Sequence, residues 1–223
     1  MASSAGIANV RKQERASNDR YRLRAFVELL ERSGELQIVQ QPVDLADIGS
    51  YLDGNPKAVL FRAVGPDRVE VVGNVAGSRS RLALAFGVSE QELRQETVRR
   101  LKNPIAPVKV LSSDAPVHEV ILTGDDADLT SLPAHLQHGL DGGVYISASI
   151  DVSESQDGQK RNIRYRRLML RGRKHAGVDL LAPSDLRAAY GKMVEQGKPM
   201  PIAFVIGSHP VDSIAAVSID SGR

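Results

Sequence analysis

The hydrophobic pattern of this chain changes at a proline-rich stretch, residues 103–116, and this change limits the folds that the chain can adopt. Before the stretch, helix-type and strand-type segments interleave, which is typical of an α/β unit. After it, short β-type runs are separated by Gly, Asp and Pro, which indicates a mainly antiparallel sheet or barrel. The sequence therefore predicts an α+β protein with a polar leader at 1–19, an α/β domain at 20–106 and a β-rich domain at 107–223.

The N-terminal part shows clear start and stop signals. Strands are expected within 35–45, where Pro42 ends the strand or places it at an edge, and over 58–61 and 69–72. Helices are expected over 18–34, 78–87 and 89–101. Ser89 and Glu92 form an S-x-x-E capping box for the last of these helices. The basic segment GNVAGSRSR, residues 73–81, could bind phosphate at a helix start. Because it is neither a Walker A motif nor G-x-G-x-x-G, an ordinary tight turn is the alternative.

The C-terminal part is read as strands with one helix between them. Strands are expected over 117–122, 144–152, 163–170 and 202–206. Ser184 caps the helix and Gly197 ends it. The last run, IAAVSIDSGR at 214–223, begins like a core strand and stops without a terminal element. Since proteins rarely leave a strand edge unpaired, the chain is expected to be incomplete or to need a partner.

Composition narrows the class of function. The net charge is only +2, aromatic residues make up 4% and Trp is absent, so neither nucleic acid nor an anionic membrane is expected as a partner. The absence of Cys excludes disulfides, thiolate catalysis and Cys-ligated metals. No apolar run approaches the roughly 18–20 residues of a membrane span, and the first residues lack a secretory signal. The default expectation is a cytoplasmic protein.

The histidines give a weak metal signal. The one close pair, His135 and His138, has a spacing that could place two ligands on one side of a helical turn. The flanking Pro133 and Gly139 favour a loop instead, and no third ligand is evident. Polar loop contacts are therefore the competing interpretation.

The densest basic cluster, residues 161–175, contains the run RNIRYRRLML. As a strand, this run has two faces. The polar face carries Asn162, Arg164 and Arg166. Arg167 falls on the other face with Ile163 and Tyr165, so we expect it to point inward, where a guanidinium needs an anionic partner. The alternative is a basic stripe that is solvated or lies at a subunit interface.

Three segments, taken in order, resemble the UbiD-type decarboxylases. These are GNVAGSRSRLALAFGV at 73–88, the acidic segment PVHEVILTGDDADLTSLP at 116–133, and the stretch from GGVY at 142 through the Asn-x-x-x-x-Arg motif. The resemblance runs from about residue 22 to the end of the chain. It implies an N-terminal α/β domain followed by a split β-barrel of the flavin reductase type that binds prenylated FMN (prFMN). In this chain the barrel is expected to be incomplete.

The resemblance implies reversible, non-oxidative decarboxylation of an aromatic, heteroaromatic or α,β-unsaturated acid with prFMN and Mn2+ or Mg2+, and K+ as a further candidate ion. Its Asn-x-x-x-x-Arg motif falls on Asn162, a metal ligand, and on Arg167, the catalytic residue that would orient the substrate carboxylate. The second metal ligand of the family, often His, falls on Asp185, whose alternative role is to complement the helix dipole. The expected cofactor contacts are Asn162, Arg164, Tyr165, Arg166, Arg167, Ser184, Asp185 and Ser218.

The remaining family glutamates, one metal ligand and two catalytic residues, have no counterpart here. The chain alone is therefore expected to be inactive, as a fragment or subunit of the enzyme. Its expected partners are a small carboxylic acid substrate, the prenyltransferase that supplies prFMN, and either further copies of itself or a complementing C-terminal chain. A non-catalytic flavin-binding, phosphate-binding or assembly module is the alternative function.

Overall fold

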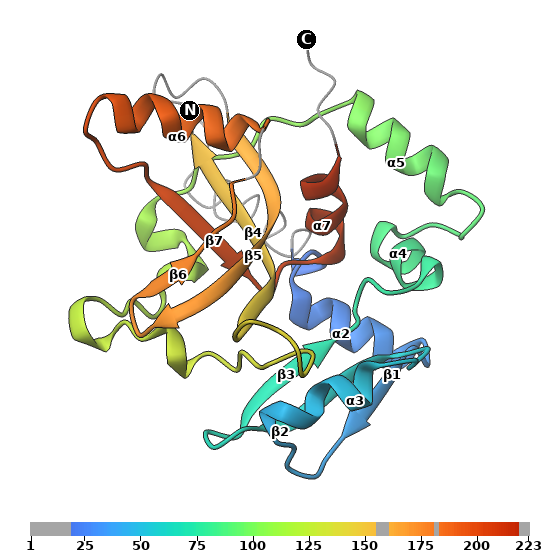
Figure 1. The fold of residues 1–223 in the computed structure, drawn as a ribbon. Helices are drawn as coiled ribbons and strands as arrows, with labels where there is room; N and C mark the ends of the chain where they lie inside the picture. The colour runs from blue at the N-terminus through green and yellow to red at the C-terminus, as the bar shows by residue number, and fades with distance from the viewer. Residues whose placement is uncertain (1–18, 155–160, 181–182, 219–223) are drawn as a thin grey trace.

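The chain folds around two sheets, as Figure 1 shows, in a computed structural model that describes residues 19–154, 161–180 and 183–218. The first sheet has the order β1-β2-β3. Its strands are β1 (Leu36–Val39), β2 (Ala58–Val64) and β3 (Val69–Gly73). β1 and β2 are parallel, whereas β2 and β3 form an antiparallel pair. The helices of this part are α2 (Leu23–Arg32), α3 (Ile48–Leu52), α4 (Arg79–Phe86) and α5 (Leu93–Lys102), with the short 3-10 helix η1 (Leu45–Asp47).

The second sheet has the order β6-β5-β4-β7, with every pair antiparallel. Its strands are β4 (Tyr145–Glu154), β5 (Arg161–Gly172), β6 (His175–Gly177) and β7 (Ile202–Ile206). Two helices accompany it, α6 (Asp185–Glu195) and α7 (Pro210–Val217). The described strands form an open sheet, so the α+β class is confirmed but the split barrel is not. None of the described helices is long and apolar enough to cross a membrane.

α4 begins where the sequence predicts, whereas α5 begins at Leu93, later than the expected start at residue 89. The Ser78 hydroxyl accepts a hydrogen bond from the Arg81 amide at the start of α4, and Gly87 ends this helix in the left-handed conformation, with φ 71°. The Ser89 amide donates to the Glu92 carboxylate ahead of α5 over 3.0 Å, which completes the capping box. α2 begins later than expected, with Arg22 at its N-cap, and residue 18 lies outside the described residues.

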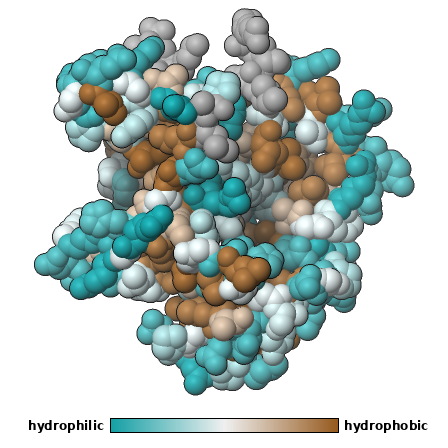
Figure 2. All heavy atoms as spheres, in the orientation of Figure 1, coloured by the Kyte–Doolittle hydropathy of each residue, from teal (hydrophilic) through white to brown (hydrophobic). Residues whose placement is uncertain are grey.

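Two expected strands are wrong. Residues 117–122 form no strand: only the 3-10 helix η3 (Pro116–His118) is regular, and the Val117 and Val120 side chains are 79% and 72% exposed. This segment follows η2 (Ser112–Asp114) and precedes η4 (Gly124–Asp126) and η5 (Leu129–Ser131). Apolar alternation did not produce a strand because none of the described strands pairs with this segment. Figure 2 shows apolar residues among the hydrophilic ones on one face of the molecule.

The second wrong strand lies at the end of the chain, where residues 214–217 belong to α7. His209 occupies its N-cap, and Pro210 takes the first helical position, where its fixed φ and missing N–H suit a helix start. These start signals and the two alanines of the helix outweigh the strand preference of its Ile and Val residues. The rest of this expected strand, 219–223, lies outside the described residues.

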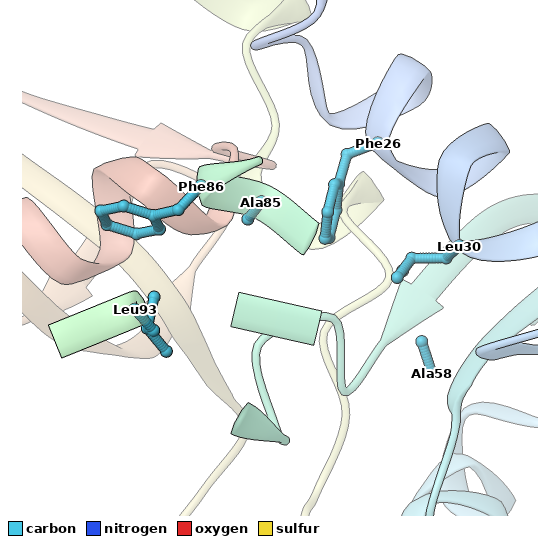
Figure 3. Close-up of a cluster of buried hydrophobic side chains, with 6 residues drawn as sticks. All are labelled: Phe26, Leu30, Ala58, Ala85, Phe86 and Leu93. Atoms are coloured by element: carbon cyan, nitrogen blue, oxygen red, sulfur yellow. The ribbon is translucent and has the colours of Figure 1, made fainter. Parts of the chain in front are cut away.

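α7 connects the two parts of the molecule. The cluster in Figure 3 combines side chains of α2, β2, α4 and α5, namely Phe26, Leu30, Ala58, Ala85, Phe86 and Leu93. Val211 and Ile214 of α7 pack against this cluster. A second cluster, Val39, Val43, Ile48, Val59, Phe61 and Val64, lies within the first sheet and its connections. The core of the N-terminal part is therefore completed by a C-terminal helix.

Arg81 shows that the basic segment at 73–81 has a structural use. Its side chain is only 1% exposed, and Nη1 donates to the Glu35 carboxylate over 3.2 Å and to the Pro56 carbonyl over 2.6 Å. Glu35 directly precedes β1, and Pro56 lies shortly before β2, so one guanidinium fixes α4 against the start of both parallel strands. The Gly77 amide also donates to the Asn74 carbonyl over 3.3 Å in a turn ahead of α4, which agrees with the tight-turn interpretation.

Arg81→Ala should destabilise the fold because it leaves a part-buried carboxylate and a carbonyl without their donor. We expect a loss of about 3 kcal/mol in the free energy of unfolding, measured by urea denaturation. Arg79→Ala is the control, because Arg79 is exposed on the same helix, and it should cost less than about 1 kcal/mol. Equal losses in the two variants would contradict this role of Arg81.

His209 makes the attachment of α7 sensitive to pH. Its ring is 3% exposed, packs edge-on against Tyr21 and Phe26, and accepts the Val211 amide at Nδ1. Burial, with a smaller effect of the nearby Arg100 charge, lowers the pKa of His209 from 6.5 to about 4. The unfolded chain therefore binds this proton first, and the stabilisation is complete above pH 6.5 and is lost as the pH falls toward 4.

The wild-type chain should lose about 2 kcal/mol of stability between pH 7 and pH 5 through this one residue. His209→Asn keeps a side-chain acceptor at the N-cap but does not titrate, so its loss over the same range should be smaller by that amount. The measurement is urea denaturation at both pH values. His138→Asn, at an exposed histidine, should behave like the wild type, and a pH dependence that survives in His209→Asn would refute the assignment.

Candidate functional site

One face of β4 is polar and buried. Ser149 and Asp151 have no exposed surface and Ser153 is 4% exposed. Alternation places these three side chains on the same face of the central strand. In the register with β5, they lie opposite Arg166, Arg164 and Asn162 in turn. The polar faces of the two strands therefore coincide.

Asp151 is the centre of the hydrogen bonds on this face. Its Oδ2 accepts from Asn162 Nδ2 and its Oδ1 from Arg166 Nε, both over 3.3 Å. Arg166 is held further by Nη1, which donates to the Asp179 carbonyl, and Ser149 donates to the Arg166 carbonyl over 2.6 Å. The side chains of Asn162 and Arg166 are thus fixed from behind by a buried carboxylate.

A pocket of about 240 Å³ lies where this face meets the start of α6. It is lined by Asn162, Arg164, Arg166, Pro183, Ser184, Asp185 and Leu186. Ser184 caps α6 by accepting a hydrogen bond from the Arg187 amide. The positive end of a helix and two guanidinium groups together favour an anion with several oxygens, such as a phosphate.

The same pocket offers hard oxygen donors. Asn162 gives its amide hydrogens to Asp151, which leaves Oδ1 as the atom available to a cation, and the Asp185 carboxylate is exposed at the first position of α6. Amide and carboxylate oxygens suit Mg2+ or Mn2+, and a bound phosphate and water would supply the remaining ligands. The residues present therefore fit a divalent cation held against a phosphate.

The histidine pair does not form a competing metal site. His138 is exposed, with Nδ1 3.8 Å from the Asp141 carboxylate, and His135 forms a β-bridge with Tyr145. Burial lowers the pKa of His135. Among the described residues, no group of three or more His, Cys, Asp or Glu side chains could hold a metal ion. These contacts agree with the polar-loop interpretation.

The predicted direction of the β5 faces is wrong. Arg167 is exposed, and its face-mates Ile163 and Tyr165 are 39% and 38% exposed, whereas Arg164 and Arg166 are half-buried over the pocket. The grouping by alternation was right, but the polar face turns inward because it pairs with the buried polar face of β4.

The structure therefore divides the predicted site residues. Five of them line the pocket: Asn162, Arg164, Arg166, Ser184 and Asp185. Ser218 lies beside them, since its carbonyl accepts from Arg164 Nη1 over 3.3 Å. Tyr165 and Arg167 lie on the opposite face, where the Tyr165 hydroxyl donates to Ser213 of α7.

Sequence reasoning missed Asp151. The available signal was the alternation S-x-D-x-S at 149–153 inside a run otherwise read as a core strand. A charged residue whose position in the alternation places it on a buried face of a strand is unusual. Such a residue indicates that hydrogen-bond donors or an opposite charge lie nearby.

Two family models match the chain one after the other. The N-terminal domain of 3-octaprenyl-4-hydroxybenzoate carboxy-lyase matches residues 27–101, and the Rift-related domain of the same enzyme matches residues 108–221. A phenolic acid decarboxylase of Sedimentibacter hydroxybenzoicus is 31% identical over 210 residues, which are 87% of this chain and 44% of the relative. An anhydromevalonate phosphate decarboxylase of Methanosarcina mazei is 32% identical over 190 residues, 84% of this chain and 42% of the relative.

Solved structures agree with these relatives. An evolved dimeric form of the UbiD-class enzyme HmfF from Pelotomaculum thermopropionicum, in complex with prFMN, has a TM-score of 0.77 and 32% identity, covering 85% of this chain and 45% of that one. The closed form of vanillic acid decarboxylase from Sedimentibacter hydroxybenzoicus has a TM-score of 0.79 and 29% identity, covering 88% and 44%. The chain spans less than half the length of the relatives that it matches.

Proposed function

Because the chain belongs to the UbiD family of carboxy-lyases, we propose that it forms the flavin-binding part of a decarboxylase acting on aromatic, heteroaromatic or α,β-unsaturated carboxylic acids. The observation that carries this proposal is the pocket at the start of α6, where two arginines and two oxygen donors meet. A relative of this fold is solved with prFMN and with FMN, which supports a flavin as the ligand.

Each group of the pocket has a role in this proposal. Arg164, Arg166 and the N-terminus of α6 bind the flavin phosphate. Asn162 Oδ1 and the Asp185 carboxylate hold Mn2+ or Mg2+ against that phosphate. The cation balances the negative charge of the phosphate and carboxylates that remains beside the two arginines. When bound, prFMN supplies the electron sink that decarboxylation requires.

Arg167 binds the carboxylate of the substrate in this proposal. Its guanidinium is exposed on the face of β5 opposite the pocket. The partly exposed side chains of Ile163 and Tyr165 lie on the same face. A planar, two-pronged cation suits a carboxylate, and the apolar neighbours suit an unsaturated or aromatic ring. One strand would thereby hold the cofactor phosphate on one face and orient the acid on the other.

Further components belong to the same proposal. The prenylated cofactor requires a prenyltransferase to supply it, and the active enzyme is a homo-oligomer or includes a complementing C-terminal chain. An evolved form of the HmfF relative is dimeric, and the vanillic acid decarboxylase ShVdcCD was also solved with a truncated ShVdcD.

FMN titration of the purified chain, followed by flavin fluorescence, tests the pocket. We expect saturable binding that tightens on addition of Mn2+. Asp185→Ala should remove the Mn2+-dependent gain, about tenfold or more, while changing stability by only about 0.3–1 kcal/mol through the helix dipole. Glu195→Ala, at the other end of α6, should bind as the wild type does.

Two outcomes would count against this assignment. Absence of FMN binding by the wild-type chain would contradict the flavin function. Equal Mn2+ dependence in Asp185→Ala and the wild type would leave the flavin site standing but reduce Asp185 to a residue that complements the helix dipole.

Arg167→Lys should separate turnover from cofactor binding in the decarboxylase that contains this chain. Lysine keeps the charge but lacks the planar fork, so we expect turnover to fall about 100-fold or more with flavin content unchanged. The measurement is a steady-state assay with flavin quantified by absorbance. Arg171→Lys, at an exposed arginine later on the same strand, is the control, and similar rates in the two variants would rule out a catalytic role for Arg167.

A further inference from the structure

Asp151 is buried in a position where its charge is costly. It lies in the central strand β4, opposite Arg164 on β5 and Phe204 on β7, and has no exposed surface. A buried carboxylate persists only when donors compensate for its lost hydration. Asn162 and Arg166 supply one donor to each oxygen. These two contacts indicate what the buried carboxylate does for the pocket.

The contact with Asn162 determines which way its amide points. If the amide were turned over, its oxygen would face the Asp151 carboxylate, and two acceptors would stand against each other without a proton between them. The orientation with Nδ2 toward Asp151 is therefore the favoured one. Since Asn162 also lines the pocket, Oδ1 is the amide atom left for a cation there.

The contact with Arg166 restrains the second pocket group. Nε is bound to Asp151 and Nη1 to the Asp179 carbonyl, while the side chain is 16% exposed. A guanidinium held at two of its nitrogens loses little further freedom when it binds an anion. Asp151 touches both the group that faces a cation and a group that faces an anion.

We propose that Asp151 is a positioning residue for a phosphate monoester bound together with a divalent cation: it turns the Asn162 oxygen toward the cation and fixes Arg166 for the phosphate. This role rests on the proposed flavin-phosphate function of the pocket. Asp151 itself contacts neither ligand, so it acts through the two residues that it orients.

Asp151→Asn gives the sharpest test, because it keeps the size of the side chain and changes its donors. The new amide accepts from Arg166 through its oxygen and presents its nitrogen to Asn162. Asn162 then turns over, and its Nδ2 faces the pocket instead of Oδ1. We expect the Mn2+-dependent gain in FMN affinity to fall about 10-fold to 100-fold, while FMN affinity in the presence of EDTA changes less than about threefold.

Ser149→Ala is the matched control. Ser149 is equally buried on the same face of β4, but its hydroxyl binds only the Arg166 carbonyl among the described residues and does not touch Asn162. This variant should lose stability and keep the Mn2+ dependence of FMN binding. In an Asn162→Ala background, Asp151→Asn should have no further effect on that dependence.

A measurement on the unaltered chain covers the case in which Asp151→Asn does not fold. The side-chain amide protons of Asn162, identified by NMR as the pair missing from Asn162→Ala, should exchange slowly with solvent because Asp151 accepts from Nδ2. Rapid exchange would overturn the proposed contact.

The outcomes separate the two proposals. Failure of the wild-type chain to bind FMN overturns the flavin function and with it the positioning role. Binding by the wild type with an unchanged Mn2+ dependence in Asp151→Asn overturns the positioning role alone.

Discussion

A carboxylate with no contact to water, in the middle strand of a sheet, restricts what its neighbours can be. Asp151 needs donors on both sides, and the antiparallel register places Asn162 and Arg166 diagonally across from it. Once these two side chains point inward, the alternation of the strand determines on which face each of the remaining β5 side chains lies. Arg164 joins the pocket, and Ile163, Tyr165 and Arg167 face away from it. The division of β5 into two chemically different faces follows from this one buried charge.

The buried charge of Asp151 also reduces the repulsion between the two arginines that line the pocket. Asp151 offsets one guanidinium, and the carbonyls of Asp179 and Ser218 accept from Arg166 and Arg164. Asp185 stands at the helix end that best tolerates a negative charge. The charges of these side chains are thus largely balanced within the protein, and guanidinium groups that lie beside a carboxylate suit a phosphate bound together with a cation.

Much of the helical structure was predictable because helix starts are decided locally. Ser78 and Ser184 cap α4 and α6 as their sequence context indicates, and the hydrogen-bonded pair of Ser89 and Glu92 lies directly ahead of α5. The pattern failed where the answer depends on distant partners. Residues 117–122 alternate like a strand but pair with none of the strands that the structure describes, and residues 214–217 join a helix.

The site residues followed a similar division. Family resemblance pointed to Asn162 and Asp185, and the structure places both on one pocket. The inward direction assigned to Arg167 was wrong, because apolar neighbours suggested the buried face while the deciding residue, Asp151, lies on another strand. Matching the polar positions of β4 with those of β5 would have placed the polar face of β5 inward, as the structure has it.

The position of α7 has a consequence for the order in which the chain can fold during synthesis. Phe26 of α2 and Ile214 of α7 share one core, although almost the whole chain separates them. At about 5–20 residues per second, a ribosome needs roughly 10–40 s to make the intervening segment. During that time the N-terminal part must wait with one side of its core open to solvent, and contacts this distant in sequence form slowly even afterwards. Chaperone binding to the nascent chain is therefore most valuable in the interval before α7 emerges.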